Sequence, residues 1–209
     1  MTEPAESTEP AKPADLLTNA HDAHDAPEYA LLGLLREGPT HGYRLAVAFA
    51  PDGRLGMILR LKMSQMYAYL RKLERAGWLR AWDEPTETHH MRHVFALTAE
   101  GERAFDAWLH EPVWATREIR LTFLLKLAFA LEDAGLVEEL VAGQRAATVA
   151  WLARLRAREA SLTATEHTAL QPQDTLRLLT LRHRIRLSEA TLAWLDEVAA
   201  VFRSAMGKR

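Results

Sequence analysis

The densest group of side chains with chemical potential is a run of cations in the N-terminal half. Residues 36–82 carry nine lysines and arginines against three acids. Such a segment attracts polyanions, and phosphate contact is a common reason for one in a soluble protein. The alternative, an ordinary solvated helix face, is not excluded by charge alone.

Within this segment, Lys62, Ser64 and Gln65 stand at the start of a predicted helix. A helix N-terminus favours a phosphate, and a glutamine side chain can pair with the N6/N7 edge of adenine. The chemistry indicated is therefore contact with double-stranded DNA. The candidate DNA-binding residues are His41, Tyr43, Lys62, Ser64, Gln65, Tyr67, Arg71, Lys72, Arg75, His90 and Arg92.

Each candidate also has a structural interpretation. Ser64 can be a simple helix cap, and Arg71 and Arg75 can form a surface row one turn apart. Tyr67 can pack against a neighbouring strand, and Tyr43 can belong to the core. These alternatives stay open at the level of sequence.

The histidines at positions 89, 90 and 93 raise the question of a metal site. An extended chain would place His90 on the opposite face from the other two, and only Glu87 has a ligand-like spacing. Imidazoles close to phosphate are the preferred interpretation, and neither a metal nor a cofactor is expected. The chain contains no cysteine, phosphate-binding glycine loop or nucleophile elbow, so we do not expect an enzyme.

Composition bounds the rest of the chain. Residues 1–28 contain seven acids and one lysine, and residues 1–26 have few large apolar side chains, which predicts a disordered acidic tail. No apolar run approaches the roughly 18 residues that a membrane span needs, and no secretory signal is visible, so a cytoplasmic location is expected.

The elements that must position the cations follow from periodicity and turn residues. Thr40, Ser64 and Thr98 are predicted helix caps, and Gly77 is predicted to close the helix that Ser64 opens. Three helices, a β-ribbon and a fourth helix form the winged version of a helix-turn-helix. The predicted elements are helices over 29–35, 41–49, 64–77 and from 98 onward, strands over 78–82 and 93–97, and a short strand over 55–61.

Beyond Pro112 the sequence predicts helices over residues 117–133, 136–162 and 174–204. The last helix carries two apolar stripes, more than one antiparallel neighbour would cover, which predicts a homodimer; the alternative is a thicker bundle within one chain. The stripe assigned to dimerisation contains Leu178, Leu181, Ile185, Leu192, Leu195 and Phe202. The second contains Leu176, Leu187, Ala190, Trp194 and Val201.

Three aromatic residues surround the Pro112 junction: Trp108, Trp114 and Phe123. Pockets tend to form between structural units, so one hypothesis is a small hydrophobic effector bound here. The favoured alternative is that the rings simply join the two parts of the chain.

Three motifs stand out along the chain: residues 29–45 (YALLGLLREGPTHGYRL), residues 66–79 (MYAYLRKLERAGWL) and residues 95–103 (FALTAEGER). In their order and spacing they resemble the PadR family of transcriptional regulators. The chain departs from the family pattern at residues 62–65, which read Lys-Met-Ser-Gln where the family usually has Ser-Pro-Gly-Ser/Thr. Base preference therefore cannot be carried over.

The resemblance implies a mainly α-helical protein with an N-terminal winged helix-turn-helix and a C-terminal long-helix dimerisation domain. It implies a sequence-specific DNA-binding regulator acting as a homodimeric repressor; the alternative is a winged-helix adaptor that binds protein. The expected divisions are a tail over 1–26, a DNA-binding domain over 27–111 and a helical domain over 112–209.

Overall fold

The structure is a computed structural model of the chain and describes residues 26–85, 91–114, 118–164 and 172–206. The acidic tail predicted over residues 1–26 lies outside these ranges apart from Ala26. His89 and His90 also lie outside them.

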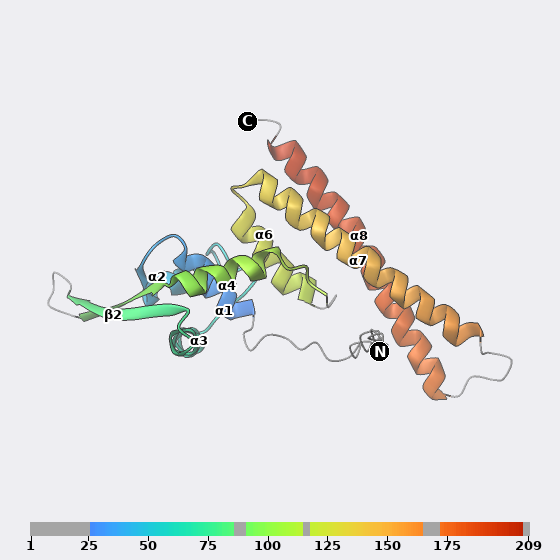
Figure 1. Cartoon of the computed structure of the whole chain (residues 1–209), viewed down its shortest axis with the longest axis horizontal. Coiled ribbons are helices and arrows are strands. Elements are labelled where there is room, and N and C mark those ends of the chain that lie inside the picture. The colour runs from blue at the N-terminus through green and yellow to red at the C-terminus, as the bar shows by residue number, and fades with distance from the viewer. Residues whose placement is uncertain (1–25, 86–90, 115–117, 165–171, 207–209) are drawn as a thin grey trace, which may run out of the picture.

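The N-terminal part is a winged helix-turn-helix (Figure 1). Its sheet has the strand order β1-β3-β2, with both pairs antiparallel, so the wing is three-stranded. The elements are α1 (Ala26–Leu35), β1 (Thr40–His41), α2 (Gly42–Ala48), α3 (Met63–Arg75), β2 (Leu79–Pro85), β3 (Met91–Leu97) and α4 (Ala99–His110). This confirms the predicted fold class.

Helix α1 is central because its sequence is apolar around its whole circumference. Leu31 and Leu32 are fully buried, and Tyr29 is stacked on Trp108 of α4 with centroids 4.8 Å apart. Gly33 permits a close approach, since a Cβ there would lie 2.5 Å from the Phe129 ring. An all-round apolar helix of this kind is stable only inside a core.

Three local predictions were wrong. Residues 55–58 form turns and residues 59–61 belong to no helix or strand. The Ile58 amide donates to the Leu55 carbonyl at 2.9 Å, because Leu55 is buried in the core. Helix α2 is capped by His41, not Thr40, because the helix begins at Gly42, and His41 Nδ1 accepts a hydrogen bond from the Arg44 amide at 3.4 Å. Helix α3 has Lys62 at its N-cap, two residues before Ser64.

Two caps are as predicted. The Thr98 hydroxyl accepts a hydrogen bond from the Gly101 amide at 3.1 Å at the start of α4. Gly77 follows α3 with a φ of 76°, a conformation that only glycine adopts without strain.

The C-terminal part begins with a π-helical turn, η1 (Ile119–Phe123), which continues into α6 (Leu124–Ala130). Helices α7 (Ala134–Ala164) and α8 (Pro172–Met206) then run side by side as a long hairpin (Figure 1). No helix among the described residues is long and apolar enough to cross a membrane.

The packing of α8 differs from the expected assignment of its stripes. Leu181 and Ile185 are buried against Leu152 and Leu155 of α7. Leu195 is fully buried in the main core, and Leu178 is also buried, whereas Leu192 and Phe202 are half-buried. The stripe expected to face a second subunit is thus largely used within one chain, because α7 and the main core cover it.

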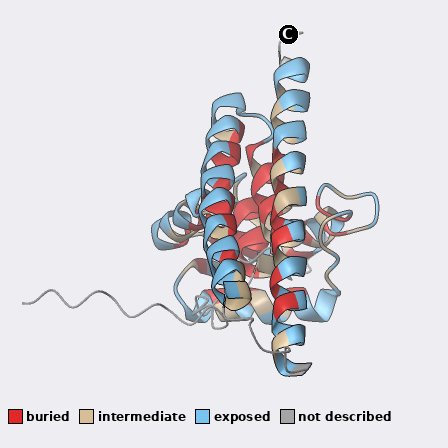
Figure 2. Cartoon of the chain, turned by 90° about the vertical axis from the view of Figure 1, so that its right-hand side faces the viewer, coloured by how far each residue is buried: buried red, intermediate tan, exposed pale blue. Residues whose placement is uncertain are grey.

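The second stripe of α8 is the more exposed one. Leu176 is 66% exposed, Val201 58% and Leu187 41%. Leu179, between the stripes, is 57% exposed. Figure 2 shows the buried positions of the two long helices turned toward the middle of the molecule.

Candidate nucleic-acid interface

Helix α3 has the division of faces that a DNA-reading helix needs. Met66, Leu70 and Leu73 recur at helical spacing and are fully buried. Arg71 and Arg75 are on the opposite, exposed side. The buried row fixes the helix on the core while the polar row stays available to a ligand.

The first turn of α3 carries its own cap. The Lys62 amide donates to Oε1 of Gln65 at 3.1 Å, and Ser64 and Gln65 are both exposed. A glutamine that pairs with adenine through both its oxygen and its nitrogen would have to release this cap. Because Lys62 is the N-cap, the interpretation of Ser64 as that cap is wrong.

The cations of α3 are not equivalent. Nζ of Lys72 lies 2.7 Å from Oε1 of Glu28, a carboxylate of α1 that is completely buried. Arg71 and Arg75 are exposed, and Nε of Arg75 donates to the Arg71 carbonyl at 3.2 Å. Lys72, expected to reach a phosphate, is paired with Glu28 in this structure, and its side chain remains 38% exposed.

Helices α2 and α3 approach closely at Gly42, the first residue of α2. A Cβ on Gly42 would lie 2.3 Å from the hydroxyl oxygen of Tyr67, so a larger residue would force the Tyr67 side chain to move. Tyr67 is half-buried and its ring lies 6.3 Å from that of Phe95, which favours the packing interpretation. His41 caps α2, whereas Tyr43 is 71% exposed and is therefore not core.

The wing presents exposed charge on both long strands. Arg92 lies 3.7 Å from Glu84, and His93 Nδ1 lies 2.7 Å from Asp83. The Arg80 guanidinium lies over the Trp82 ring at 5.4 Å, an exposed pair absent from the sequence candidates. The alternation of residues 78–82 was the signal that could have revealed it, since it places 80 and 82 on one strand face.

The three aromatic residues of the junction do not surround one cavity. Trp108 is stacked on Tyr29. Phe123 is buried, and its ring centroid lies 6.0 Å from that of Trp194. Trp114 is 46% exposed. These contacts favour the joining role for Trp108 and Phe123.

Two buried polar side chains hold the connector between the two parts. Lys126 donates from Nζ to the Glu111 carbonyl and lies 4.9 Å from the Trp108 ring; burial lowers its pKa to about 8. Gln144 accepts from the Val113 amide at 2.7 Å and donates to the Val113 carbonyl at 2.8 Å. A cavity of about 90 Å³ lies between Lys126, Gln144 and Phe123.

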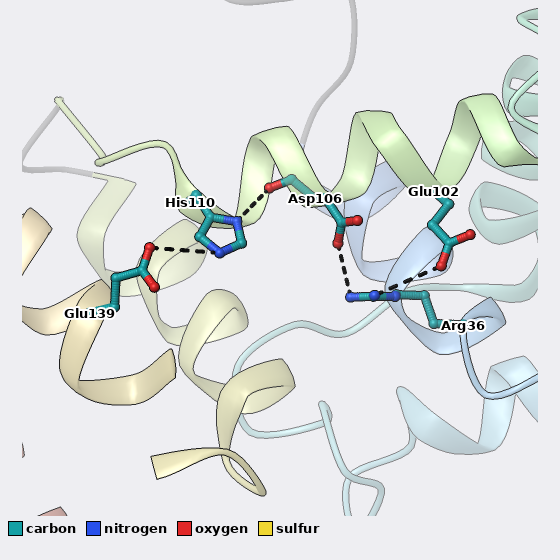
Figure 3. Close-up of polar contacts among 5 residues, drawn as sticks. All are labelled: Arg36, Glu102, Asp106, His110 and Glu139. Carbon is teal, nitrogen blue, oxygen red and sulfur yellow. Dashed lines mark hydrogen bonds and ion pairs between the residues drawn. The ribbon is translucent and has the colours of Figure 1, made fainter. Parts of the chain in front are cut away.

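A row of charged contacts follows α4 to the same junction on the surface (Figure 3). Arg36, just after α1, lies 3.1 Å from Asp106 of α4, and His110 at the end of α4 lies 3.8 Å from Glu139 of α7. The Nδ1 atom of His110 donates to the Asp106 carbonyl at 2.9 Å, which fixes the ring so that Nε2 faces Glu139. These contacts link α1, α4 and α7 on one side of the molecule.

Comparison with known proteins agrees with this architecture. The sequence profile of the transcriptional regulator PadR-like family matches residues 31–107, and that of the virulence activator alpha C-terminal region matches residues 119–203. The chain is 31% identical over 186 residues to the "Probable transcriptional regulator Rv1176c" of Mycobacterium tuberculosis, covering 82% of this chain and 94% of that protein. The chain belongs to the PadR-like family of transcriptional regulators.

Other PadR-like proteins are also similar. The negative transcriptional regulator PadR of Bacillus subtilis is 33% identical over 104 residues, or 49% of this chain and 55% of that one. The crystal structure of Bacillus subtilis PadR with operator DNA is 26% identical and covers 85% of this chain and 99% of that chain, with a TM-score of 0.40. The family assignment supports a transcriptional regulator over a winged-helix adaptor.

Proposed function

We propose that the protein represses transcription as a homodimer that binds double-stranded DNA through α3 and the wing. The observation that carries this proposal is the two-faced α3, with Met66, Leu70 and Leu73 buried and an exposed polar face beside the three-stranded wing. Helices mounted in this way enter the major groove in winged helix-turn-helix proteins.

The parts of this surface have different roles in the proposal. Arg71, Arg75 and Arg92 neutralise phosphates, while Ser64 and Gln65 approach base edges from the first turn of α3. Lys72 orients α3 through Glu28. Repression is supported by the name of the Bacillus subtilis relative, a negative regulator.

Homodimerisation is supported by the exposed apolar stripe of α8. Leu176, Leu187 and Val201 would each remain partly in water in a single chain. Contiguous exposed apolar surface on a soluble protein marks an association site. We place the subunit contact on this second stripe rather than on the stripe first assigned to it.

The proposal is tested by selecting genomic DNA fragments with the purified protein and measuring affinity on the enriched site. Gln65→Ala should cost about 1–3 kcal/mol on that site and little on random DNA. Arg92→Ala should weaken both and reduce the slope of log affinity against log salt by about one. Arg154→Ala, on the exposed face of α7, is the matched control and should change neither.

If wild-type protein enriches no fragment, or if both substitutions leave affinity unchanged, the DNA-binding proposal fails and the adaptor gains support. In this proposal the protein acts by binding DNA and not by catalysis. It acts in the compartment that holds the genome, in line with the cytoplasmic location expected from the sequence.

A second proposal concerns a small effector at the junction. The cavity beside Phe123 has apolar walls, including Leu109 and Leu140, and the buried Lys126 and Gln144 offer polar groups. At about 90 Å³ the cavity is smaller than an aromatic ring needs, so a small aromatic compound with a polar or acidic group would enter only if the connector moved. A panel of such compounds should change tryptophan fluorescence and DNA affinity together; a panel without effect leaves only the joining role.

A further inference from the structure

Arg54 is a basic residue of the DNA-binding half that makes contacts away from the proposed DNA surface. It lies in the connection between α2 and α3, and its Nη1 pairs with Glu37 after α1. Its Nη2 donates to the Ala128 carbonyl of α6 at 3.2 Å. The guanidinium also lies over the Phe129 ring, 5.5 Å from the centroid.

The connection that carries Arg54 has little freedom. The Leu55 side chain is fully buried, and its amide donates to the Ala48 carbonyl at 2.8 Å. A Cβ on Gly53 would lie 2.2 Å from the Val47 carbonyl oxygen, and one on Gly56 would lie 1.7 Å from that of Ala50. The backbone around Arg54 is therefore folded tightly onto the end of α2, directly upstream of α3.

The other end of the contact is the C-terminal turn of α6. The last four carbonyls of a helix lack intrahelical donors, and the helix dipole favours a cation there. Ala128 is one of these residues, and Phe129 beside it packs edge-to-face on Phe105 of α4 at 5.4 Å. Three residues separate the end of α6 from the start of α7, so this turn leads straight into the hairpin.

Only arginine has the geometry for all three contacts. Its planar fork presents separate N–H groups to the carboxylate and to the carbonyl while its face covers the ring. A lysine at this position would keep the positive charge but could not make the paired N–H contacts with the carboxylate and the carbonyl. Since the guanidinium is already occupied in this way, phosphate neutralisation does not account for it.

We propose that Arg54 is a positioning residue that fixes the winged half relative to the α7–α8 hairpin and thereby sets the half-site spacing that the dimer accepts. The inference rests on the proposed function. In a two-fold dimer the hairpins hold the subunits together, so the angle between hairpin and winged half determines how far apart the two α3 helices lie.

The test compares wild-type protein with Arg54→Lys on the selected full site, on an isolated half-site and on full sites with one or two base pairs added or removed. For Arg54→Lys, affinity for the full site should fall about tenfold while affinity for the half-site stays within about twofold. Wild-type affinity should drop sharply when the spacing changes, and the variant should show a flatter dependence on spacing.

Arg75→Met, on the exposed face of α3, is the matched control and should weaken full and half-sites together, without altering the preferred spacing. Arg154→Lys, on the exposed face of α7, should change neither affinity nor spacing. Thermal unfolding of each variant checks its fold. Glu37→Gln, which removes the charge of one partner of Arg54, supplies a milder variant that should shift the spacing profile in the same direction.

The inference is overturned if Arg54→Lys keeps the wild-type spacing profile, or if it weakens half-site and full-site binding equally. It is also overturned if Arg54→Met lowers the salt slope by about one while Arg54→Lys restores it, because a phosphate contact would behave so. A wild-type protein with no salt-dependent DNA complex would overturn the proposed function itself.

Discussion

The winged half and the α7–α8 hairpin bury their apolar residues to different degrees. In the winged half, α1 is covered on all sides and α3 buries a complete row of apolar residues. The hairpin buries one stripe of α8 and leaves Leu176, Leu179, Leu187 and Val201 exposed by 41–66%. Ion pairs between exposed side chains, such as Arg145 with Asp196 at 3.0 Å, link its two helices.

The winged half therefore buries its apolar residues within one chain, whereas the hairpin does so only in part. A surface ion pair contributes about 0–1 kcal/mol, so pairs of this kind cannot replace missing apolar cover. A second copy can supply that cover. The comparison therefore indicates that the DNA-reading part is built within each chain and that the hairpin is completed by assembly.

The largest effect is expected where the hairpin joins the core. Leu195→Asp places a charge at a fully buried position and should lower the free energy of unfolding by more than about 4 kcal/mol. Leu176→Asp, at a position 66% exposed, is the control and should cost less than about 1 kcal/mol in the monomer. Urea denaturation measures both, and equal costs would contradict the division between the two stripes.

The next effect concerns assembly alone. Leu187→Glu should convert a dimer into a folded monomer, because it places a charge in the middle of the exposed stripe. Light scattering at micromolar concentration gives the mass, and circular dichroism should show unchanged helix content. Met57→Glu, an exposed apolar position of the winged half at 96%, should remain dimeric. A dimeric Leu187→Glu protein would move the subunit contact elsewhere.

A smaller effect depends on pH at the boundary between the two regions. Burial lowers the pKa of Lys126 from 10.5 to about 8, so between these values the unfolded chain binds more protons than the folded one. Stability attributable to this group should therefore rise with pH, by on the order of 1–2 kcal/mol from about pH 7 to pH 10. Urea denaturation of wild type against Lys126→Met isolates the slope, which the variant should lack.

The smallest effect is expected from the hairpin surface. Asp196→Asn removes the partner of Arg145, and both side chains are more than half exposed. The unfolding free energy should change by less than about 0.5 kcal/mol. A cost of several kcal/mol would show that charge, rather than apolar burial, holds the hairpin together.

Local patterns were sufficient for most of the fold. The period of Met66, Leu70 and Leu73 predicted the buried face of α3, and Gly77 and Thr98 marked real helix boundaries. The strand predicted over residues 55–61 failed because Leu55 contacts the core through a turn, which apolar content alone does not distinguish from a strand.

The roles of the candidate site residues were harder to predict from the sequence, because they depend on contacts with residues far away in the chain. Lys72 and Arg75 are both cations on one helix, yet only Lys72 has the buried Glu28 beneath it. The two stripes of α8 could be seen in the sequence, but which of them meets α7 depends on the register of the hairpin. Likewise nothing local relates Arg54 to Ala128, 74 residues away.

The side chain of Gln144 serves Val113 as a neighbouring β-strand would. Its amide oxygen accepts a hydrogen bond from the Val113 N–H and its amide nitrogen donates one to the Val113 C=O, although residues 112–114 belong to no helix or strand. The backbone N–H and C=O groups of Val113 are thus both hydrogen-bonded, as they would be in a β-sheet, although no strand lies beside them. Hydrogen exchange at the Val113 amide should accordingly be as slow as in the surrounding core, and bending between the two halves at this residue would require both bonds to break.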